Sequence, residues 1–483
     1  MDQNNEYRIE DGVLYLELSG KLDKNSADEL REKFNRICAE AEFSGICIDM
    51  NALSGISSAG LSVLLAMKKS LMGGSMRAEN VNSVVMQLFE DTGFDSFIET
   101  ETAAGGNEIA VSNANFSKWV ACWGTATSIT ERREATYAKD ITFRYPIHLC
   151  FNGSKIRVHF SNLTGTDDVV LNKAFADKIP LTVNGKKEIK IKAGKEILTD
   201  EIEYSARKGG TVYISFYLKN FTQMNAGTLV TGPLSGGGYA YGDFADKNSL
   251  PDELSNTTQW YYFLNTVDVY TEAKNYAVCC YGDSITAQDW PDYLQLELEK
   301  RRKNDIAVIR RAVCGTRILR QYDCIAYQSY GLKGETRFPI ETNIAGLKTV
   351  IIQHGINDII HPVGVEVNKF RPMTDMPVFD ELKDGVENFY VSCARANDLK
   401  VISGTLLPIY GWRTYSEDKE ALRKEFNEWL RTSKSFDGCI DFDKAVRDEN
   451  QIEKFGEGYD SGDHLHPSQK AYMKMAEVAA DML

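Results

Sequence analysis

The stretch Ala277-Val-Cys-Cys-Tyr-Gly-Asp-Ser284 decides the fold of the last third of the chain. Its first five residues form an apolar run, which is typical of a parallel strand that is covered on both faces. Gly282 and Asp283 then turn the chain, so that Ser284 opens a helix at the carboxyl end of that strand. Open α/β sheets bind their ligands at this edge. Ser284 is therefore a candidate functional residue.

Similar apolar runs recur downstream and extend this pattern. Val350–Ile352 and Val401–Ile402 are short buried-type strands, and the apolar residues between 382 and 393 fall on one helical face. Strands that alternate with helices indicate a parallel sheet between two helical layers. We therefore predict an α/β/α domain over residues 273–483.

Three further motifs follow the predicted strands or lie near the end of the chain. Val313-Cys-Gly315-Thr316 and Gly355-Ile-Asn357-Asp358 both offer an N–H donor at a strand end, as an oxyanion hole requires. Asp463 precedes His466 by three residues, and such a carboxylate can orient the imidazole as a base for a serine. The adjacent His464 raises the alternative of a metal site, but no pattern supplies a third ligand, so we expect no metal and no cofactor.

Together these motifs resemble the SGNH, or GDSL, hydrolase family, whose order along the chain is Ser, Gly, Asn, Asp and His. The resemblance covers about residues 275–483. It implies that Ser284 is the nucleophile, that His466 is the general base and that Asp463 orients it. It also implies that the oxyanion is held by the N–H groups of Ser284 and Gly315 and by the Asn357 amide. No role passes to His464.

The middle of the chain, residues 118–272, has the alternation of antiparallel strands. Val212, Ile214, Phe216 and Leu218 alternate with residues whose side chains carry a hydroxyl group, which favours a β-sandwich or jelly roll. This stretch resembles the sandwich module that precedes the hydrolase domain in a subgroup of SGNH enzymes associated with xylan degradation. The resemblance implies a carbohydrate O-acetylesterase. A lipid esterase or lysophospholipase of the same family is the alternative.

Residues 1–100 resemble a STAS domain, the fold of anti-sigma factor antagonists. The motifs that carry the resemblance are Gly20-Lys-Leu-Asp23, Ile56-Ser-Ser-Ala-Gly-Leu61 and Asp91-Thr-Gly-Phe94. The position that a partner kinase phosphorylates in that family matches Ser58, at the start of a predicted helix. The small, polar residues 101–117 read as a linker. The resemblance implies regulation through a protein partner, and a catalytically silent scaffold is the alternative in another functional class.

Charge and sequence patterns limit where in the cell we expect the protein and what it binds. The formal charge of −14 argues against binding to nucleic acid or to an anionic membrane surface. The sequence shows neither a leader pattern nor a run of eighteen apolar residues, which predicts a cytoplasmic protein. Several of the ten cysteines lie in apolar strands, so we expect free thiols rather than disulfides.

Overall fold

The chain forms two compact units, Met1–Ala114 and Asn115–Leu483. The computed structural model describes residues 7–10, 12–71, 74–81, 83–92, 94, 98–102, 115–129 and 137–483. Most of the predicted linker, 101–117, lies outside these residues. Among the described residues, no helix is both long enough and apolar enough to cross a membrane.

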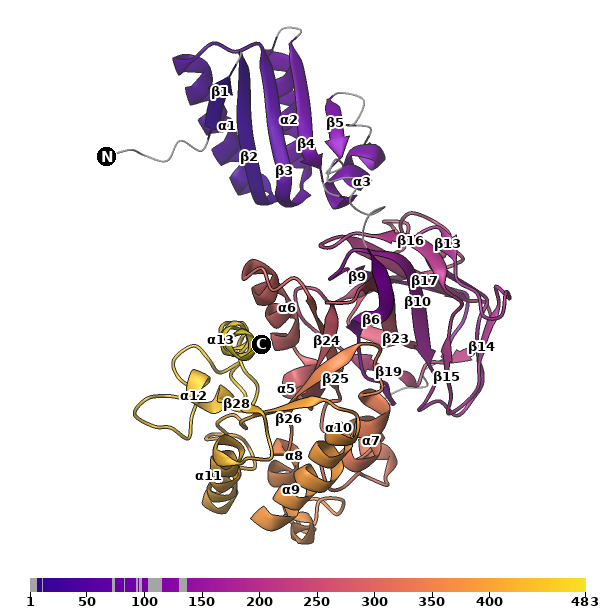
Figure 1. Cartoon of the computed structure of the whole chain (residues 1–483), viewed down its shortest axis with the longest axis vertical. Helices are drawn as coiled ribbons and strands as arrows, with labels where there is room; N and C mark the ends of the chain where they lie inside the picture. Colours follow the sequence, from indigo (N-terminus) through magenta and orange to yellow (C-terminus); the bar gives the residue numbers. More distant parts are fainter. Residues whose placement is uncertain are drawn as a thin grey trace. The chain divides into compact units, whose positions relative to one another are not determined.

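The first unit is a five-stranded sheet with the strand order β1-β2-β3-β4-β5 (Figure 1). β1 pairs antiparallel with β2, and the other neighbours are parallel. Its apolar core includes Leu14 and Ile48 of the sheet and Phe34, Leu64 and Phe89 of the helices. The elements are β1 Tyr7–Glu10, β2 Val13–Leu22, α1 Lys24–Glu40, β3 Gly45–Ile56, α2 Ser58–Ser70, β4 Ser75–Val81, α3 Ser83–Thr92 and β5 Glu99–Thr102.

The second unit begins with a β-sandwich, as the alternating pattern predicts. One sheet has the order β15-β10-β23-β6, with β16 also on β10, and the other has the order β13-β12-β17-β9-β20-β21. The inward side chains fill a common core. These strands are β6 Phe116–Gly124, β9 Ile141–His148, β10 Gly153–Ser161, β12 Lys173–Ala176, β13 Ile179–Pro180, β15 Glu196–Leu198, β16 Ile202–Ala206, β17 Thr211–Leu218, β20 Gly237–Tyr241, β21 Asn256–Thr258 and β23 Leu264–Glu272.

Further short strands, in two pairs and one three-stranded sheet, complete the sandwich. They are β7 Ser128–Ile129, β8 Tyr137–Ala138, β11 Val169–Leu171, β14 Ile189–Ile191, β18 Thr222–Gln223, β19 Ala226–Leu229 and β22 Trp260–Tyr262. The turn at Asn184 and Gly185 has positive φ at both residues, the geometry that an Asn-Gly hairpin turn requires.

The rest of the unit is an α/β layer structure around one parallel sheet. Its strand order is β25-β24-β26-β27-β28. The strands are β24 Tyr276–Gly282, β25 Ile306–Ala312, β26 Leu347–Gln353, β27 Lys400–Gly404 and β28 Gly438–Ile440. β24 comes first in the chain and lies between β25 and β26. The chain therefore continues first on one side of β24 and then on the other. A ligand crevice is expected at the carboxyl end of such a strand.

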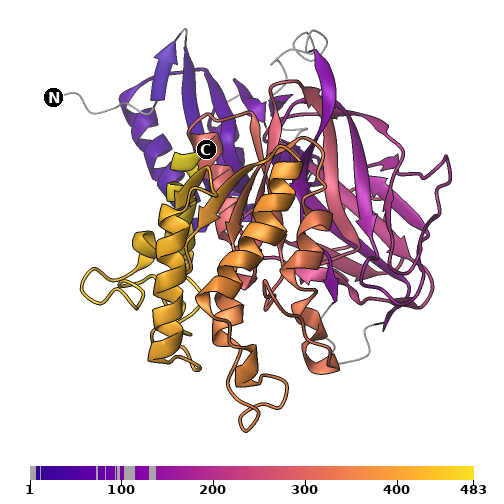
Figure 2. The ribbon, with the colours of Figure 1, turned by 60° about the horizontal axis from the view of Figure 1, so that its bottom comes forward.

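Helices cover both faces of this sheet (Figures 1 and 2). α6 and α13 pack against each other on one face, and α7, α9, α10 and α11 lie on the other. The helical elements are α5 Ser284–Ala287, α6 Trp290–Lys300, η2 Ile325–Tyr330, α7 Gly334–Glu341, α8 Ile356–Ile360, η3 Met373–Asp375, α9 Phe379–Gly385, η4 Val386–Val391, α10 Ser392–Ala396, α11 Glu417–Thr432, α12 Phe442–Val446 and α13 Gln469–Met482.

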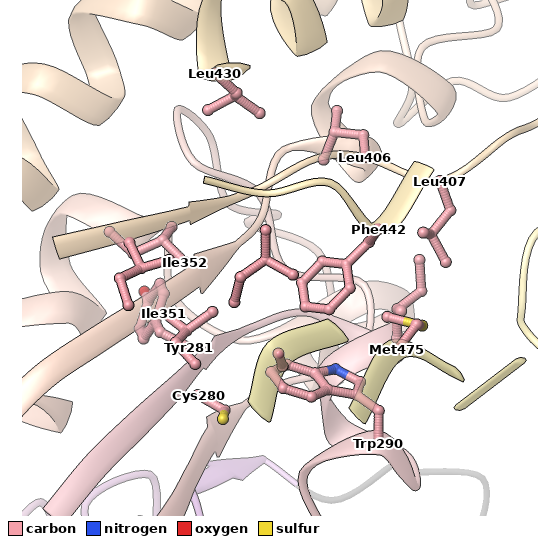
Figure 3. Close-up of a cluster of buried hydrophobic side chains, with 14 of the residues drawn as sticks. Cys280, Tyr281, Trp290, Ile351, Ile352, Leu406, Leu407, Leu430, Phe442 and Met475 are labelled. Atoms are coloured by element: carbon pink, nitrogen blue, oxygen red, sulfur yellow. The ribbon is translucent and has the colours of Figure 1, made fainter. Parts of the chain in front are cut away.

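The core of the α/β part packs the strands of the parallel sheet against the helices that cover it, and Figure 3 shows part of this core. Trp290 is fully buried, and its ring centroid lies 5.2 Å from that of Phe442. Burying a large apolar side chain contributes about 1.5–3 kcal/mol. Dense packing here gives the residues that follow the strands a rigid support.

The sandwich and the α/β part share apolar packing. Ala307 and Ile309 of the edge strand β25 and Ala277 of its neighbour β24 belong to the same core as the sandwich side chains. The backbone N–H of Ala121 also donates to the carbonyl of Ala345 at 2.9 Å. We therefore propose 118–272 and 273–483 as two domains with a permanent interface, divided where β23 ends.

Candidate active site

Strand register places three of the predicted site residues at one edge of the sheet. Gly282, the last residue of β24, pairs with Ala312 of β25 and with Gln353 of β26. Ser284, Gly315 and Asn357 follow these paired positions by two, three and four residues. Residues far apart in the sequence therefore converge at the carboxyl end of the central strand.

Ser284, His466 and Asp463 form a continuous hydrogen-bonded chain. The Ser284 hydroxyl lies 2.8 Å from Nε2 of His466, and Nδ1 of His466 lies 2.7 Å from Oδ2 of Asp463. With Asp463 ionised, Nδ1 carries the proton that bonds to the carboxylate, and Nε2 is left to accept from the serine. This is the arrangement that activates a serine nucleophile.

Hydrogen bonds within the loop hold Asp463 and His466 in place. Oδ1 of Asp463 accepts the backbone N–H groups of Leu465 at 2.9 Å and of His466 at 2.8 Å. Burial opposes ionisation, but these hydrogen bonds and the one from the His466 ring hold the pKa of Asp463 well below its usual range. His464 points elsewhere, because its Nδ1 pairs with Asp460 at 2.5 Å.

Asp283 presents Ser284 by capping the short helix α5. Its Oδ1 accepts the backbone N–H of Ile285 at 3.1 Å, so Ser284 takes the first helical position. The side chain is fully buried, and burial raises its pKa to about 7. Ser284 thus stands at a rigid strand-to-helix turn.

Gly315 and Asn357 occupy the positions that the sequence predicts for the oxyanion donors. Gly315 has φ +76°, the left-handed region that favours glycine, and a Cβ there would collide with the ring of Tyr330. Asn357 is buried, and its amide donates to the carbonyl of Thr316 at 3.0 Å. That bond uses one hydrogen of the amide and fixes its plane, which leaves the second hydrogen for a ligand.

Sequence reasoning missed the residues that hold this loop in place. Nε2 of His354 lies 3.2 Å from the carbonyl of Thr316, and its Nδ1 lies 2.8 Å from the hydroxyl of Tyr390. Burial, assisted by the charge of Arg337, lowers the pKa of His354 to about 3, so its ring is neutral. In that neutral ring, the Nε2 atom donates a hydrogen bond to the Thr316 carbonyl, and the Nδ1 atom accepts one from the Tyr390 hydroxyl.

Asp358 fixes the chain just beyond Thr316. Its two carboxylate oxygens accept the N–H groups of Ile318 at 2.8 Å and of Leu319 at 3.0 Å. Burial raises the pKa of Asp358 to about 6. The sequence signal was its place beside Asn357 in the Gly-x-Asn-Asp motif, but the partners of its side chain could not be read from spacing.

Aromatic side chains pack together next to Gly315. The ring of Tyr330 lies against Gly315 and stacks on the ring of His361, with centroids 5.3 Å apart. The buried Tyr322 packs behind both rings, and its hydroxyl lies 3.1 Å from Nδ1 of His361. The Tyr330 ring therefore fills the space next to Gly315, and the other two rings pack against it.

Ser58 also lies at the start of a helix, but its surroundings differ. Ser57 caps α2, because its hydroxyl oxygen accepts the N–H of Gly60 at 3.3 Å and its hydroxyl donates to the Leu22 carbonyl at 3.1 Å. Ser58, the next residue, is exposed. Of the two serines, Ser58 therefore offers the accessible hydroxyl.

Among the described residues, one group has metal-ligand chemistry. His148, Cys150 and Glu299 place one ligand atom each within 4.8 Å of one another. These side chains already have partners: Nε2 of His148 pairs with Glu299 at 2.7 Å, and the Cys150 thiol donates to the carbonyl of Cys122. Burial raises the pKa of Cys150 and keeps it a thiol, which opposes metal binding. All ten cysteines are free.

Comparisons with known families agree with both resemblances. Residues 4–105 match the STAS domain family, and residues 280–474 match the GDSL-like lipase/acylhydrolase family. The chain therefore joins a STAS domain to an SGNH hydrolase enzyme domain of the GDSL-like lipase/acylhydrolase family.

Individual relatives cover one part of the chain or the other. The anti-sigma-B factor antagonist of Bacillus subtilis is 27% identical over 108 residues, which are 22% of this chain and 97% of that protein. An acetyl xylan esterase structure is 17% identical over 43% of this chain and 99% of its own, with a TM-score of 0.32. An acetyl-xylooligosaccharide esterase from Geobacillus is 16% identical over 43% of this chain and 93% of its own, with a TM-score of 0.30.

Proposed function

We propose that the protein hydrolyses short-chain O-acyl esters of carbohydrates, O-acetyl esters above all, through an acyl-serine intermediate. The single observation that carries the chemistry is the hydrogen-bonded chain from Ser284 through His466 to Asp463. No step of this chemistry requires a metal or an organic cofactor.

The mechanism follows from the geometry. His466 takes the proton of Ser284 as its Oγ attacks the ester carbonyl, and Asp463 stabilises the imidazolium that forms. The oxyanion binds to the N–H groups of Ser284 and Gly315 and to the Asn357 amide. His466 then protonates the leaving alcohol, and water attacks the acyl-serine in a second cycle of the same steps.

A short acyl group is supported by the wall of aromatic rings at Gly315. Tyr330 fills the space beside the donor, with His361 and Tyr322 packed behind it. A short acyl group needs less room beside these rings than a long chain does. The carbohydrate alcohol is supported by the resemblance of the sandwich to the subgroup associated with xylan degradation.

The test is a kinetic comparison of acyl groups on one alcohol. Acetyl and octanoyl esters of the same leaving group are assayed for kcat/KM, followed by acetylated xylo-oligosaccharides. We expect acetyl to exceed octanoyl by at least about tenfold, because the subgroup that the sandwich resembles points to sugar acetates. A preference for octanoyl would instead indicate a lipid esterase. No hydrolysis of either ester would favour the catalytically silent scaffold.

The STAS domain supplies regulation in this proposal. Ser58 is exposed at the first position of α2, where a phosphate would meet the positive end of the helix dipole. A partner kinase would modify this hydroxyl and change the binding of a regulatory protein. Neither step requires a residue of the esterase site.

A further inference from the structure

A buried arginine of the parallel sheet joins the helix that carries Ser284 to the sandwich. Arg310 lies in β25, paired with Cys280 of β24, and its side chain is 4% exposed. Its Nη1 donates to the carbonyl of Ala287, the last residue of α5, at 3.3 Å. The same atom donates to the carbonyl of Thr231 in the sandwich at 2.9 Å. One guanidinium therefore contacts both α5 and the neighbouring domain.

The sandwich segment 231–236 is fixed at the same corner. Nη2 of Arg310 donates to Oδ1 of Asp292 in α6 at 2.6 Å. Oδ2 of Asp292 accepts two hydrogen bonds from the segment, one from a backbone N–H at 2.9 Å and one from a hydroxyl at 2.8 Å. A Cβ at Gly232 would collide with this carboxylate, so the approach requires a glycine. Arg310 and Asp292 thus tie the segment to the start of α6.

The carboxyl end of α5 depends on bonds from outside the helix. α5 is a single turn of four residues, and the last carbonyl groups of a helix find no N–H partner within it. Arg310 supplies a donor to the carbonyl of Ala287. The Thr231 hydroxyl donates to Oδ1 of Asp289, two residues beyond α5, at 2.5 Å. Both bonds connect this end of the turn to the sandwich.

We propose that Arg310 is a positioning residue for Ser284, and that the sandwich fixes the direction of α5 through it. The Ser284 hydroxyl has to stay within hydrogen-bond reach of His466, from which it lies 2.8 Å away. A displacement of about 1 Å at a reacting group can lower a rate about a hundredfold. The inference rests on the proposed serine chemistry, and it gives the sandwich a part in catalysis that requires no contact with substrate.

Arg311 offers a matched control, because it bridges the same two domains without a bond to α5. It is 3% exposed, and it donates to the carbonyl of Asn265 in the sandwich at 3.2 Å and to that of Glu341 in the α/β part at 3.1 Å. Arg310→Met and Arg311→Met therefore each remove one buried arginine from the interface. Only the first removes a bond to the helix that carries Ser284.

The experiment compares the reactivity of Ser284 in the full chain. Each variant is labelled with a fluorophosphonate probe well below its Tm, and kcat and KM are measured on a small acetyl ester. Arg310→Met is expected to lower the labelling rate and kcat at least tenfold and to leave KM within about twofold. Arg311→Met is expected to lower the Tm but to change the labelling rate less than threefold. Arg310→Lys, which keeps the charge and a donor, should recover part of the loss.

Thr231→Val keeps the inference testable if loss of Arg310 prevents folding. This change removes only the hydroxyl that donates to Asp289, and it is expected to lower the labelling rate about threefold. Thr222→Val is its control, because the Thr222 hydroxyl donates to the carbonyl of Asn220 within the sandwich. The control should label at the rate of the wild type.

Two results would overturn the proposal: labelling of Arg310→Met within threefold of the wild type, or an equal loss in Arg311→Met, which would show a general loosening of the interface. If Arg310→Met does not fold, labelling of Thr231→Val at the rate of the wild type overturns it in the same way. Slower labelling of Arg310→Met in a protein that hydrolyses no acetyl ester would refute the proposed function and leave this inference standing.

Discussion

Ser284 and Ser58 occupy the same local structure in different parts of the chain. Each serine takes the first position of a helix that follows a strand, and in each case the preceding residue, Asp283 or Ser57, caps that helix. Only Ser284 has a base, the Nε2 atom of His466 at 2.8 Å. All six histidines of the chain lie beyond residue 147, so none belongs to the STAS region.

The difference teaches that a helix start presents a hydroxyl but does not activate it. Activation requires a base that tertiary structure brings from elsewhere, here from 182 residues further along the chain. An exposed serine without such a base is not a nucleophile itself, but another enzyme can modify it, which is the role proposed for Ser58. Four substitutions test this contrast, from the largest effect to the smallest.

Ser284→Ala removes the nucleophile and is expected to lower kcat for a small acetyl ester by about a millionfold. Ser58→Ala is its matched control, since it removes a helix-start hydroxyl without a base, and it should leave kcat unchanged within about twofold. Steady-state kinetics on both variants provides the measurement. Residual activity of Ser284→Ala within threefold of the wild type would reject the nucleophile.

His466→Ala removes the base and is expected to lower kcat by about ten-thousandfold or more, because Ser284 then keeps its proton. His464→Ala is the control two residues away. Its ring pairs with Asp460, so its removal should change kcat by less than about threefold. Equal losses in the two variants would show that the loop, and not the base, had been damaged.

Asp283→Asn tests the buried cap beside the nucleophile through pH. Burial raises the pKa of Asp283 to about 7 from its ordinary 3.8, so between these pH values the folded state holds a proton that the unfolded state has lost. The stability contributed by this proton falls as the pH rises through the window and is lost above about pH 7.

The amide of Asp283→Asn does not titrate. The Tm of this variant minus that of the wild type should therefore rise by several degrees from pH 4 to pH 7 and then level off. The corresponding change in the free energy of unfolding is about 4 kcal/mol at most. Thermal unfolding of both proteins at four pH values provides the measurement. A difference that is flat across this range would contradict the buried, protonated carboxyl.

Ser58→Asp has the smallest expected effect. A phosphate would add about −1.5 to −2 charges, and the aspartate imitates part of that charge at a helix start that tolerates it. We expect the variant to capture about threefold less of a STAS partner from cell lysate, and Ser58→Ala to capture as much as the wild type. Equal recovery by all three proteins in pull-down mass spectrometry would leave Ser58 without a regulatory role.

The sequence predicted the parts of the molecule that short-range pattern controls. Apolar runs located the parallel strands, alternation located the sandwich, and strand ends located Ser284, Gly315 and Asn357. The residues that hold the Thr316 loop were not predicted, because their partners lie far away in the sequence. His354 bonds to Tyr390 and Thr316, which are 36 and 38 residues away. No periodicity encodes such contacts, since they depend on how the layers pack.

The buried ion pair of Asp268 in the sandwich was not predicted for a similar reason. Asp268 lies in β23, and its partner Arg157 lies 111 residues away in the sequence. A buried charge in a strand pattern was a usable signal, because aspartate is almost never buried without a partner.

Mapping the adduct of a fluorophosphonate probe tests the central claim most directly. The probe modifies only a serine that a base has activated, so it distinguishes the two helix-start serines within one protein. After labelling of the wild type, digestion and tandem mass spectrometry, we predict a stoichiometric adduct on Ser284, none on Ser58, and no adduct in His466→Ala. An adduct on any other serine, or labelling of Ser284 that persists in His466→Ala, would contradict the account.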